Sequence, residues 1–490
     1  MSTRFSSADA AWLHMDRPTN LMVINSLSLF DEPVDWARVI ENTQQRLVDR
    51  YPKFRQRAVE SRLPLQTPKW VDDPYFAIEH HMHHLALPAP GDTKALQELI
   101  GDLITMPLDR SKPLWHTYMI EGYGEGAAML SRMHHCIADG ISLARLMLSL
   151  TDSEPDAGIA SPDGSDEAPP PAGLLADVAG SSAELARGAI RLGGGVVKQG
   201  VSVARSPTHA ARLAGAIGRD ASTVMRLLLT PSDAATAIKG DPGISRRVAW
   251  APPIPLERIK RIARANDATV NDVLLAAVSG ALRHYLQERG SNVGEIQAMV
   301  PFNLRPLDQP IPRKLGNKFG LVFLPLPVGT SGSYRRLVEV HKRMQELKSG
   351  RDGAISYGIL SLTGMTPEPL ERRIIDVFTG KGTAVMTNVP GPREPVYVAG
   401  TPIRTCLFWA PTSGHIGMSV SIFSYRGEVT VGLMVDAALV PDPDEIVTQL
   451  ERELYALGQL EIGRRRRSPR RRRPDGRDAH KRTGKEPSTA

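Results

Sequence analysis

Two adjacent histidines, an aspartate and a glycine stand at fixed spacing in the segment His134–Gly140, and this pattern limits the fold more than any other feature of the chain. Residues 126–133 form a short, mostly apolar run beside a turn glycine, which is typical of a buried strand. Residues 141–148 have the pattern of a helix. The histidines are therefore expected at the end of a strand, with the Asp-Gly pair in the following turn, where rigid elements hold side chains at a cleft.

His135 is the candidate catalytic residue of this segment. A neutral imidazole with a pKa near 6.5 accepts a proton from an attacking hydroxyl at cellular pH, and such base catalysis contributes about 10²- to 10⁴-fold in rate. Asp139 lies just past the turn and is expected to hold it through a salt bridge without touching substrate. The alternative is that His134 and His135 are hydrogen-bonded core histidines. The complete pattern, which includes Gly140, favours the catalytic interpretation.

The HHCIADG segment resembles the motif of the acyl-CoA-dependent acyltransferases, a superfamily that includes chloramphenicol acetyltransferases, carnitine acyltransferases and the condensation domains of peptide synthetases. From about Phe5 to about Pro443, the chain resembles the bacterial bifunctional wax ester synthase/diacylglycerol acyltransferase family, because further elements follow in the same order. They are a PLW element at Pro113, Leu114 and Trp115, an ND element at Asn271 and Asp272, residues 300–306, and an NVPGP element at residues 388–392. The ordered set is more specific than any one of these short elements.

This resemblance implies an α/β fold of two chloramphenicol acetyltransferase-like sandwich domains, with the active site in a tunnel between them. It also implies direct transfer in a ternary complex: acyl-CoA enters one face of the tunnel, a lipid alcohol enters the other, and His135 deprotonates the alcohol. No metal, cofactor or covalent intermediate is expected, and acyl-CoA is a co-substrate. Diacylglycerol, giving triacylglycerol, is the first choice of acceptor. A long-chain alcohol, giving wax ester, is the second.

Two other functions stay open. A condensation-like acyltransferase would use the same histidine but would take its acyl group from a carrier protein, and the PLW, ND and NVPGP elements weigh against it. A catalytically inactive lipid-droplet protein would be held at the droplet by basic and amphipathic segments, and the intact HHxxxDG pattern weighs against it.

Supporting residues are expected in the second half of the chain. A helical pattern with Thr269 as its N-cap places Asn271 in the first turn. There Asn271 either donates to a developing oxyanion or, with Asp272, only caps the helix. The resemblance favours Arg305 as a buried partner of Asp139, and a surface arginine is the alternative. By the same resemblance, the substrate tunnel is lined by Pro113, Leu114, Trp115, Asn388, Pro390 and Gly391.

The chain divides at residues 153–171, a linker rich in Pro, Asp, Ser and Gly. The expected units are an N-terminal acyltransferase domain, a linker with an amphipathic connector, a C-terminal acyltransferase domain and a basic tail, at residues 1–152, 153–243, 244–460 and 461–490. An apolar run at residues 21–30 precedes a helical stretch at residues 35–47. Strand-like runs in the second half lie at residues 321–324 and 429–433.

The basic character of the chain belongs to its tail. The whole chain has a formal net charge of +7, but residues 463–490 hold 12 Lys or Arg against 3 acidic residues, net +9, which leaves about −2 for the rest. Such a run without an apolar anchor is expected to be disordered, either as a solubilising tail or as a tether to anionic lipid. Nucleic-acid binding is not expected, because no stacking aromatic residues alternate with the arginines.

Basic residues also recur at every seventh position from Arg191 to Arg226. On a helix this step drifts by only about 20°, so it gives a basic stripe beside apolar residues. Residues 193–195 are all glycine and Pro207 follows, so two or three short amphipathic segments are expected. They form either a solvated connector or an interfacial patch on a membrane or lipid droplet.

The sequence favours a cytoplasmic protein with peripheral contact to a membrane or lipid droplet. Two cysteines, Cys136 and Cys406, make no disulfide framework, and no apolar signal segment follows the first residues. No stretch approaches the roughly 18 apolar residues of a membrane-spanning helix.

Three other apparent sites are interpreted as structural. The histidines of residues 80–84 resemble a metal cluster, but the segment resembles a strand of the family in which His81 and His84 recur without metal. Cys136 occupies a variable position of the motif, so it is not expected to form a nucleophilic pair with His135. No GxSxG elbow is present, and the triple glycine lacks the ending of a phosphate-binding loop, so neither a serine hydrolase nor an NTPase is supported.

Overall fold

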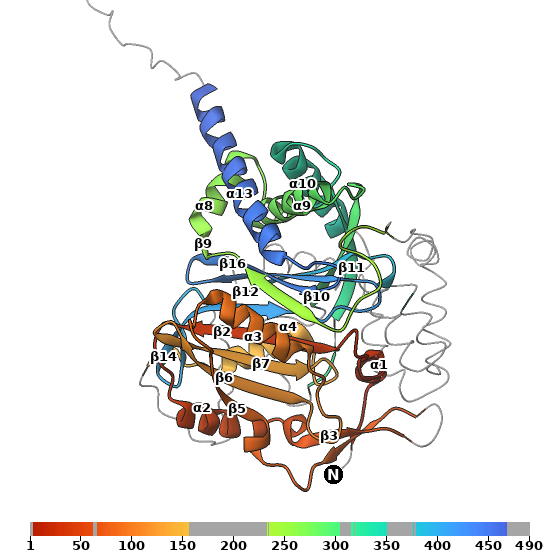
Figure 1. The fold of residues 1–490 in the computed structure, drawn as a ribbon, viewed down its shortest axis with the longest axis vertical. Coiled ribbons are helices and arrows are strands. Elements are labelled where there is room, and N and C mark those ends of the chain that lie inside the picture. Colours follow the sequence, from red (N-terminus) through yellow and green to blue (C-terminus); the bar gives the residue numbers. More distant parts are fainter. Residues whose placement is uncertain are drawn as a thin grey trace, which may run out of the picture.

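The computed structural model describes residues 3–61, 66–155, 233, 235–303, 315–317, 319–349, 376 and 379–467. Several predictions concern residues outside these ranges: the pairing of Arg305, the amphipathic segments at residues 173–230, most of the linker, and the basic tail beyond residue 467. The described residues form two large mixed β-sheets and one small sheet. The two large sheets lie one above the other in Figure 1.

A six-stranded sheet carries the HHxxxDG segment. Its neighbouring strands are antiparallel except for β5 and β6, and its order is β13-β14-β2-β7-β6-β5. The strand β7, Gly126–His134, is buried along its whole length, so the strand predicted at residues 126–133 is confirmed. The other strands are β2 Val23–Phe30, β5 Met82–Ala86, β6 Trp115–Tyr123, β13 Tyr397–Val398 and β14 Thr401–Trp409.

The second half of the chain forms a seven-stranded sheet. Its order is β11-β10-β12-β15-β16-β8, and β9 pairs with β16 beside this path. The strands are β8 Arg246–Trp250, β9 Ile254–Pro255, β10 Ile296–Asn303, β11 Phe319–Leu326, β12 Ala384–Pro390, β15 Met418–Tyr425 and β16 Glu428–Asp436. The runs predicted as strands at residues 321–324 and 429–433 lie within β11 and β16 and are confirmed. The small sheet has the order β1-β4-β3, with β1 Thr3–Arg4, β3 Gln56–Val59 and β4 Lys69–Asp72.

A strand from the second half of the chain completes the sheet of the first half. β14 pairs antiparallel with β2, with Trp409 opposite Asn25. Residues from both halves also share a hydrophobic cluster, in which Leu130 of β7 packs with Val248 of β8 and Trp409 of β14. The two halves therefore interlock, which the hydrophobic pattern of residues 401–409 does not reveal. The unit boundaries placed at residues 153–243 stay a prediction.

Polar side chains cap the helices of the first half. Ser6, Asp35, Asp92 and Asp139 each accept a hydrogen bond from a backbone N–H in the first turn, which satisfies a donor that the helix itself leaves unpaired. The predicted helices at residues 35–47 and 141–148 are confirmed, the first with a π-helical turn at Gln44–Val48. The helices are α1 Ser7–Met15, α2 Trp36–Thr43, α3 Thr93–Thr105 and α4 Gly140–Ser149.

The helices of the second half pack together above the seven-stranded sheet in Figure 1. α9, Val270–Glu288, has Thr269 as its N-cap, as predicted, and a capping box with Asp272. Around it pack α8 Leu256–Ala265, α10 Ser333–Ser349 and α13 Pro443–Arg467. Among the described residues, no helix combines the length and the apolar character needed to cross a bilayer.

Candidate active site

The HHxxxDG segment turns between β7 and α4. β7 ends at His134, and α4 begins at Gly140 with Asp139 as its N-cap. The Asp139 carboxylate accepts a hydrogen bond from the backbone N–H of Ser142 at 2.8 Å. Asp139 is buried, and its carboxylate lies at the start of α4, where the helix dipole favours a negative group. The carboxylate therefore holds the turn by capping α4.

Asn317, from the second half of the chain, binds the imidazole of His135. The amide Nδ2 of Asn317 donates to the backbone oxygen of His135 at 2.8 Å and to Oδ1 of Asp9 at 2.8 Å. Because the amide nitrogen faces these two acceptors, the amide oxygen faces Nδ1 of His135, 2.9 Å away. An amide oxygen only accepts, so Nδ1 carries the proton. The lone pair of neutral His135 is therefore on Nε2.

A buried ion pair anchors Asn317. Oδ1 of Asp9 also accepts the backbone N–H of Asn317 at 3.0 Å, and Oδ2 of Asp9 lies 3.2 Å from Nζ of Lys53. Lys53 donates in addition to the backbone oxygen of Ile137, at 2.9 Å, within the HHxxxDG turn. Asp9 is 4% exposed, so its charge is shielded from solvent and neutralised by Lys53. The series Lys53, Asp9, Asn317 and His135 links α1, the motif turn and the segment before β11.

Aromatic rings enclose the imidazole. The ring of Trp12 stacks on His135 with 3.9 Å between centroids and 13° between planes, and Phe319 lies 5.4 Å away. Burial lowers the pKa of His135 to about 4, while the charge of Asp139 and the hydrogen bond with Asn317 raise it by less. His135 is therefore neutral at pH 7, which is the form that accepts a proton.

His134 faces away from this arrangement and stabilises the turn. Its Nδ1 accepts the backbone N–H of Cys136 at 3.1 Å. Its Nε2 lies 3.8 Å from Oδ1 of Asp16, which is too long for a direct hydrogen bond. Burial raises the pKa of Asp16, but the nearby His134, the hydrogen bond from the backbone N–H of Met22 and the charge of Arg110 outweigh it and hold that pKa below its usual value. His134 and Asp16 thus join the motif to the start of β2.

The ND and NVPGP elements meet each other. Oδ1 of Asn271, in the first turn of α9, accepts a hydrogen bond from Nδ2 of Asn388 in β12 at 2.9 Å. Asp272 completes the capping box with Thr269, and its carboxylate lies 2.7 Å from Nδ1 of His341. Within the described residues, neither Asn271 nor Asp272 forms a hydrogen bond with His135. The geometry gives Asp272 a capping role and leaves the side-chain N–H groups of Asn271 as candidate donors.

The glycine of the NVPGP element is required by close packing. A Cβ atom on Gly391 would lie 2.4 Å from Cζ of Phe423 and 2.7 Å from the backbone oxygen of Ser424. The backbone N–H of Gly391 donates to that same oxygen at 2.7 Å. The chain can therefore leave β12 alongside β15 only with a glycine here. The element fixes the end of β12, which lies at Pro390, two residues after Asn388.

The PLW element packs in the core beside the strand that leads into the motif. Leu114 and Trp115 are fully buried, and the backbone oxygen of Leu114 accepts the N–H of His134 at 3.0 Å. The indole N–H of Trp115 donates to the backbone oxygen of Phe54 at 2.8 Å. Pro113 is buried beside them. These contacts place the element in the core next to β7, so its conformation sets the position of the first motif histidine.

Three of the four histidines at residues 80–84 have side-chain partners within the fold. Nδ1 of His81 lies 2.8 Å from the backbone oxygen of Trp115, and Nε2 of His83 lies 2.8 Å from Nδ1 of His116. His84 pairs with Glu121 at 2.7 Å. In the part of the chain that the structure describes, no group of three or more His, Cys, Asp or Glu side chains is arranged to hold a metal ion.

Sequence reasoning missed Asp9, Trp12, Lys53 and Asn317. Asp9 stands inside the segment where the family resemblance begins, and Asn317 stands just before the apolar strand β11. A buried aspartate within an otherwise apolar helix, with Ala8, Ala10 and Ala11 around it, is a signal that this carboxylate has a partner. Nothing in the sequence indicates which residue that partner is.

Two family models match this chain. The model of the wax ester synthase/diacylglycerol acyltransferase catalytic domain matches residues 5–274, and the model of the WS/DGAT C-terminal domain matches residues 315–458. A protein of Mycobacterium tuberculosis named "Probable diacyglycerol O-acyltransferase tgs1" is 29% identical over 485 residues, which cover 95% of this chain and 98% of that protein. The O-acyltransferase WSD of Acinetobacter baylyi is 28% identical over 391 residues, 79% of this chain and 82% of that protein.

Solved structures share the fold. The wax ester synthase/diacylglycerol acyltransferase of Marinobacter aquaeolei VT8 matches with a TM-score of 0.65 at 22% identity, covering 94% of this chain and all of that chain. The first condensation domain of the calcium-dependent antibiotic synthetase matches with a TM-score of 0.56 at 18% identity, covering 94% and 96%. The predicted fold class, two α/β units of the acyltransferase type, is confirmed.

Proposed function

This chain belongs to the wax ester synthase/diacylglycerol acyltransferase family, and we propose that it moves a long-chain fatty acyl group from acyl-CoA to the free hydroxyl of diacylglycerol, with His135 as the general base. The family makes it an acyl-CoA-dependent O-acyltransferase. The observation that carries the proposed mechanism is the hydrogen bond between Nδ1 of His135 and Asn317, because it leaves the lone pair on Nε2.

The proposed reaction is a direct transfer. Nε2 of His135 takes the proton of the acceptor hydroxyl while the hydroxyl oxygen bonds to the thioester carbonyl carbon. The carbonyl oxygen becomes an oxyanion, the C–S bond then breaks, and the CoA thiolate takes the proton back from Nε2. Neither a metal ion nor a covalent enzyme intermediate is needed for this sequence of steps.

Asn317 and Asp9 are positioning residues in this proposal. When Nε2 takes a proton, the imidazole becomes a cation, and the amide oxygen of Asn317 accepts from its Nδ1–H. The Asp9 carboxylate accepts from the same amide at 2.8 Å, which polarises that oxygen toward the imidazolium. The arrangement thus holds the ring in one orientation and stabilises the charge that develops during transfer.

Asn271 is the proposed donor to the oxyanion. Its side-chain oxygen is occupied by Asn388, so its side-chain N–H groups point the other way. It also lies in the first turn of α9, where free backbone N–H groups and the positive end of the helix dipole favour a negative charge.

Diacylglycerol is the preferred acceptor in the proposal, since the mycobacterial relative that bears that name aligns over 95% of this chain. A long-chain alcohol, giving a wax ester, is the second candidate, since the Marinobacter protein of the same fold bears both names. Two products distinguish them, because triacylglycerol and wax ester separate readily by chromatography.

The test is transfer of radiolabelled hexadecanoyl from its CoA thioester, with diacylglycerol and hexadecanol offered separately. Wild type, His135→Ala and the control His415→Ala are compared, because His415 is half exposed and lies outside the site. We expect transfer by wild type and by the control, and none by a folded His135→Ala. A folded wild type that transfers only from a carrier-bound thioester would instead make the chain a condensation-like enzyme. A folded wild type that transfers from neither donor would favour the alternative of a catalytically inactive lipid-droplet protein.

The enzyme is further proposed to act at a membrane or lipid-droplet surface in the cytoplasm, because both substrates carry long hydrocarbon chains and the sequence of residues 173–230 predicts basic, amphipathic segments. Removal of residues 173–230 tests this, with cell fractionation as the measurement. Loss of the protein from the lipid fraction is expected, and unchanged association would remove the proposal.

A further inference from the structure

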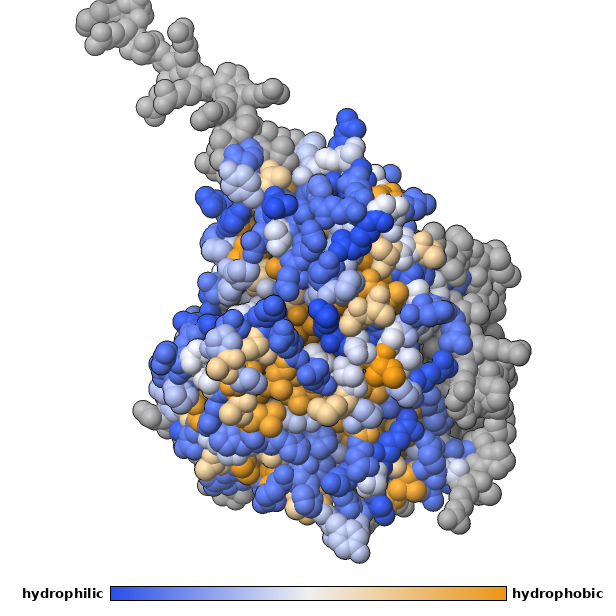
Figure 2. Space-filling model, in the orientation of Figure 1, coloured by the Kyte–Doolittle hydropathy of each residue, from blue (hydrophilic) through white to orange (hydrophobic). Residues whose placement is uncertain are grey.

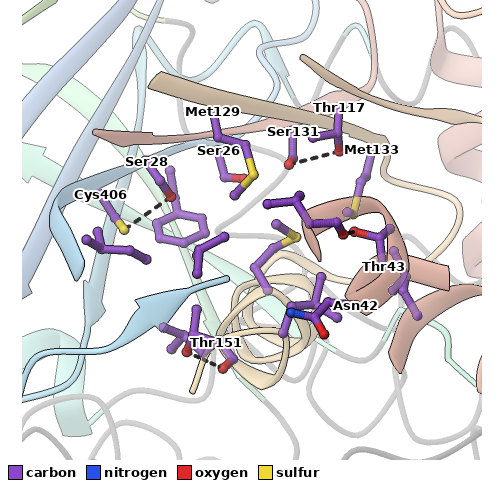
Figure 3. Close-up of a pocket in the computed structure, with 18 residues that line it drawn as sticks. Ser26, Ser28, Asn42, Thr43, Thr117, Met129, Ser131, Met133, Thr151 and Cys406 are labelled. Atoms are coloured by element: carbon purple, nitrogen blue, oxygen red, sulfur yellow. Dashed lines mark hydrogen bonds between the residues drawn. The ribbon is translucent and has the colours of Figure 1, made fainter. Parts of the chain in front are cut away.

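A buried cavity lies between the six-stranded sheet and the helices α2 and α4. Figure 3 shows side chains from β2, β6, β7 and β14 on one side of it and from α2 and α4 on the other. Half of its lining residues are methionine, leucine, valine or isoleucine, one is Phe408, and the others are serine, threonine, asparagine and cysteine. The roof helix α4 starts in the HHxxxDG turn itself, at Gly140.

The floor of the cavity runs directly away from His135. Side chains alternate along a strand, so Met129, Ser131 and Met133 of β7 all project into the cavity. His135 is the next residue in this alternation, and its N–H bonds to the backbone oxygen of Met22 at 2.7 Å, which extends the pairing of β7 with β2 by one more step. The cavity and the imidazole therefore share one face of the sheet.

The pairing register divides the cavity into rows at increasing distance from His135. Ser131 stands opposite Ser26, which stands opposite Phe408, and this is the middle row. Met129 stands opposite Ser28, which stands opposite Cys406, and this is the far row.

At about 3.4 Å per residue, the far row lies about 20 Å from His135. One leaflet of acyl chains spans about 15 Å, half the hydrocarbon thickness of a bilayer. The floor is thus long enough for a fatty chain whose reacting end lies at His135.

Most polar side chains of the wall already take part in hydrogen bonds, although Oδ1 of Asn42 on α2 is buried without a partner among the described residues. Thr117 and Ser131 share a hydrogen bond of 3.1 Å, and Ser28 lies 3.5 Å from the sulfur of Cys406. Thr43 donates to the backbone oxygen of Val39 at 2.8 Å. These groups place no demand on a ligand for hydrogen bonds. Burial raises the pKa of the Cys406 thiol to about 12, which reflects apolar surroundings.

The empty cavity is narrow, with a volume of about 40 Å³. A chain must therefore push wall side chains aside to enter. Three methionines, Met129, Met133 and Met147, line the cavity, and the unbranched, flexible methionine side chain adapts to occupants more easily than leucine or isoleucine does. A change of rotamer at these three methionines would therefore widen the cavity.

We propose that this cavity is the subsite for an unbranched hydrocarbon chain of a substrate, with the reacting end of that substrate at Nε2 of His135. The proposal rests on the acyltransferase function proposed above. It specifies which part of the protein sets the preferred length of the substrate chain. The chain belongs either to the acyl donor or to the acceptor, and the two sources are distinguished by experiment.

Filling the far row shortens the space for the chain. Cys406→Leu and, independently, Ser28→Val add methyl groups there without changing the row nearest His135. Each variant and wild type are assayed with acyl-CoA donors of eight to eighteen carbons against one acceptor, and with alcohols of the same lengths against one donor. We expect kcat/KM for the longest chains to fall about ten-fold or more in one series, with the shortest chains unchanged.

Enlarging the far row tests the same proposal in the opposite direction. Met129→Ala is expected to shift the preferred length toward longer chains in that same series. The matched control is Met418→Ala, which removes another buried methionine, from the core of the second half, and is expected to leave the length preference as in wild type. Thermal unfolding of every variant shows which ones are folded.

A shift in the donor series assigns the cavity to the acyl chain of the CoA thioester, and a shift in the acceptor series assigns it to the alcohol; both support the subsite. Folded, active variants without a shift in either series overturn it.

Calorimetric binding of hexadecanoic acid separates this inference from the proposed function. Binding by an inactive wild type, weakened in Cys406→Leu, would retain the subsite and reject the transferase. Absence of both binding and transfer would reject both.

Discussion

The amide oxygen of Asn317 lies 2.9 Å from Nδ1 of His135, so a residue in the second half of the chain fixes the proton position on a histidine in the first half. The same amide bonds to the backbone oxygen of His135 and to Asp9. The Asn317 side chain can therefore make all of these bonds only when α1, the motif turn and the segment before β11 lie in their folded positions. An imidazole oriented in this way exists only when both halves have folded together.

Asn317→Ala removes the acceptor for Nδ1–H and frees the imidazole to adopt the other tautomer. We expect kcat to fall by about 10²- to 10⁴-fold, the range seen when catalytic base orientation is lost. KM for acyl-CoA is expected to stay near the wild-type value, since the amide binds His135, the proposed base, and not the substrate. The matched control is Asn266→Ala, which removes an amide bonded to the end of α8. A folded Asn317→Ala with full activity would show that the ring is oriented by other contacts.

Asp9 and Asn317 are expected to act as one unit. In Asp9→Asn the Lys53 ammonium loses its carboxylate partner, and the oxygen that still accepts from Asn317 no longer carries the negative charge that polarises the amide. We expect each single variant to lower kcat and the double variant Asp9→Asn/Asn317→Ala to lose little more than the worse single variant. Additive losses in kcat, measured on folded proteins, would mean that the two residues contribute independently.

Stability is expected to decrease as the pH falls below about 6.5. Burial holds the pKa of His135 at about 4 in the folded protein, below the usual value of about 6.5. Between these two pH values, the histidine is therefore protonated in the unfolded chain but neutral in the folded protein. The part of the unfolding free energy that depends on a neutral His135 is fully present above pH 6.5 and is lost as the pH falls toward 4. It amounts to roughly 3 kcal/mol.

Denaturant unfolding at several pH values checks this expectation. His135→Phe removes the titrating group while keeping an aromatic ring beside Trp12, so its unfolding free energy is expected to vary less between pH 6.5 and 4. Part of the dependence will remain, because burial also lowers the pKa of His116, to about 3. Identical pH profiles for variant and wild type would contradict the assignment to His135.

Local pattern is sufficient to predict the elements that carry the motif. Residues 126–133 are mostly apolar because β7 is buried on both faces, and Thr269 caps α9 because a capping box forms with Asp272. Pattern is insufficient for contacts between distant segments. The pairing of β14 with β2 and the bonds of Asn317 to His135 join the two halves of the chain, and neither leaves a periodic signal in the residues involved. The motif thus predicts the base, and only the assembled fold identifies what orients it.

Gly391→Ala tests the packing of the NVPGP element. The added Cβ would meet Phe423 and the backbone oxygen of Ser424 at distances that real Cβ atoms do not adopt. We expect a loss of about 1–3 kcal/mol in the free energy of unfolding, because backbone or ring must shift to make room. Gly294→Ala is the matched control, since its added Cβ has open space around it. Equal stability of both variants in urea unfolding would show that this part of the chain yields without cost.

Asn271 and Asn388 form a pair that separates oxyanion stabilisation from structural support. Either Asn271→Ala or Asn388→Ala removes their shared hydrogen bond, so both are expected to cost about 1 kcal/mol of stability or less at this partly exposed position. Only Asn271→Ala also removes the proposed donor to the oxyanion, so only it is expected to lower kcat by about 10²- to 10³-fold. Steady-state kinetics of the two folded variants decide the matter. If both lose activity to the same small extent, Asn271 serves to join α9 to β12, and the oxyanion is stabilised by other groups.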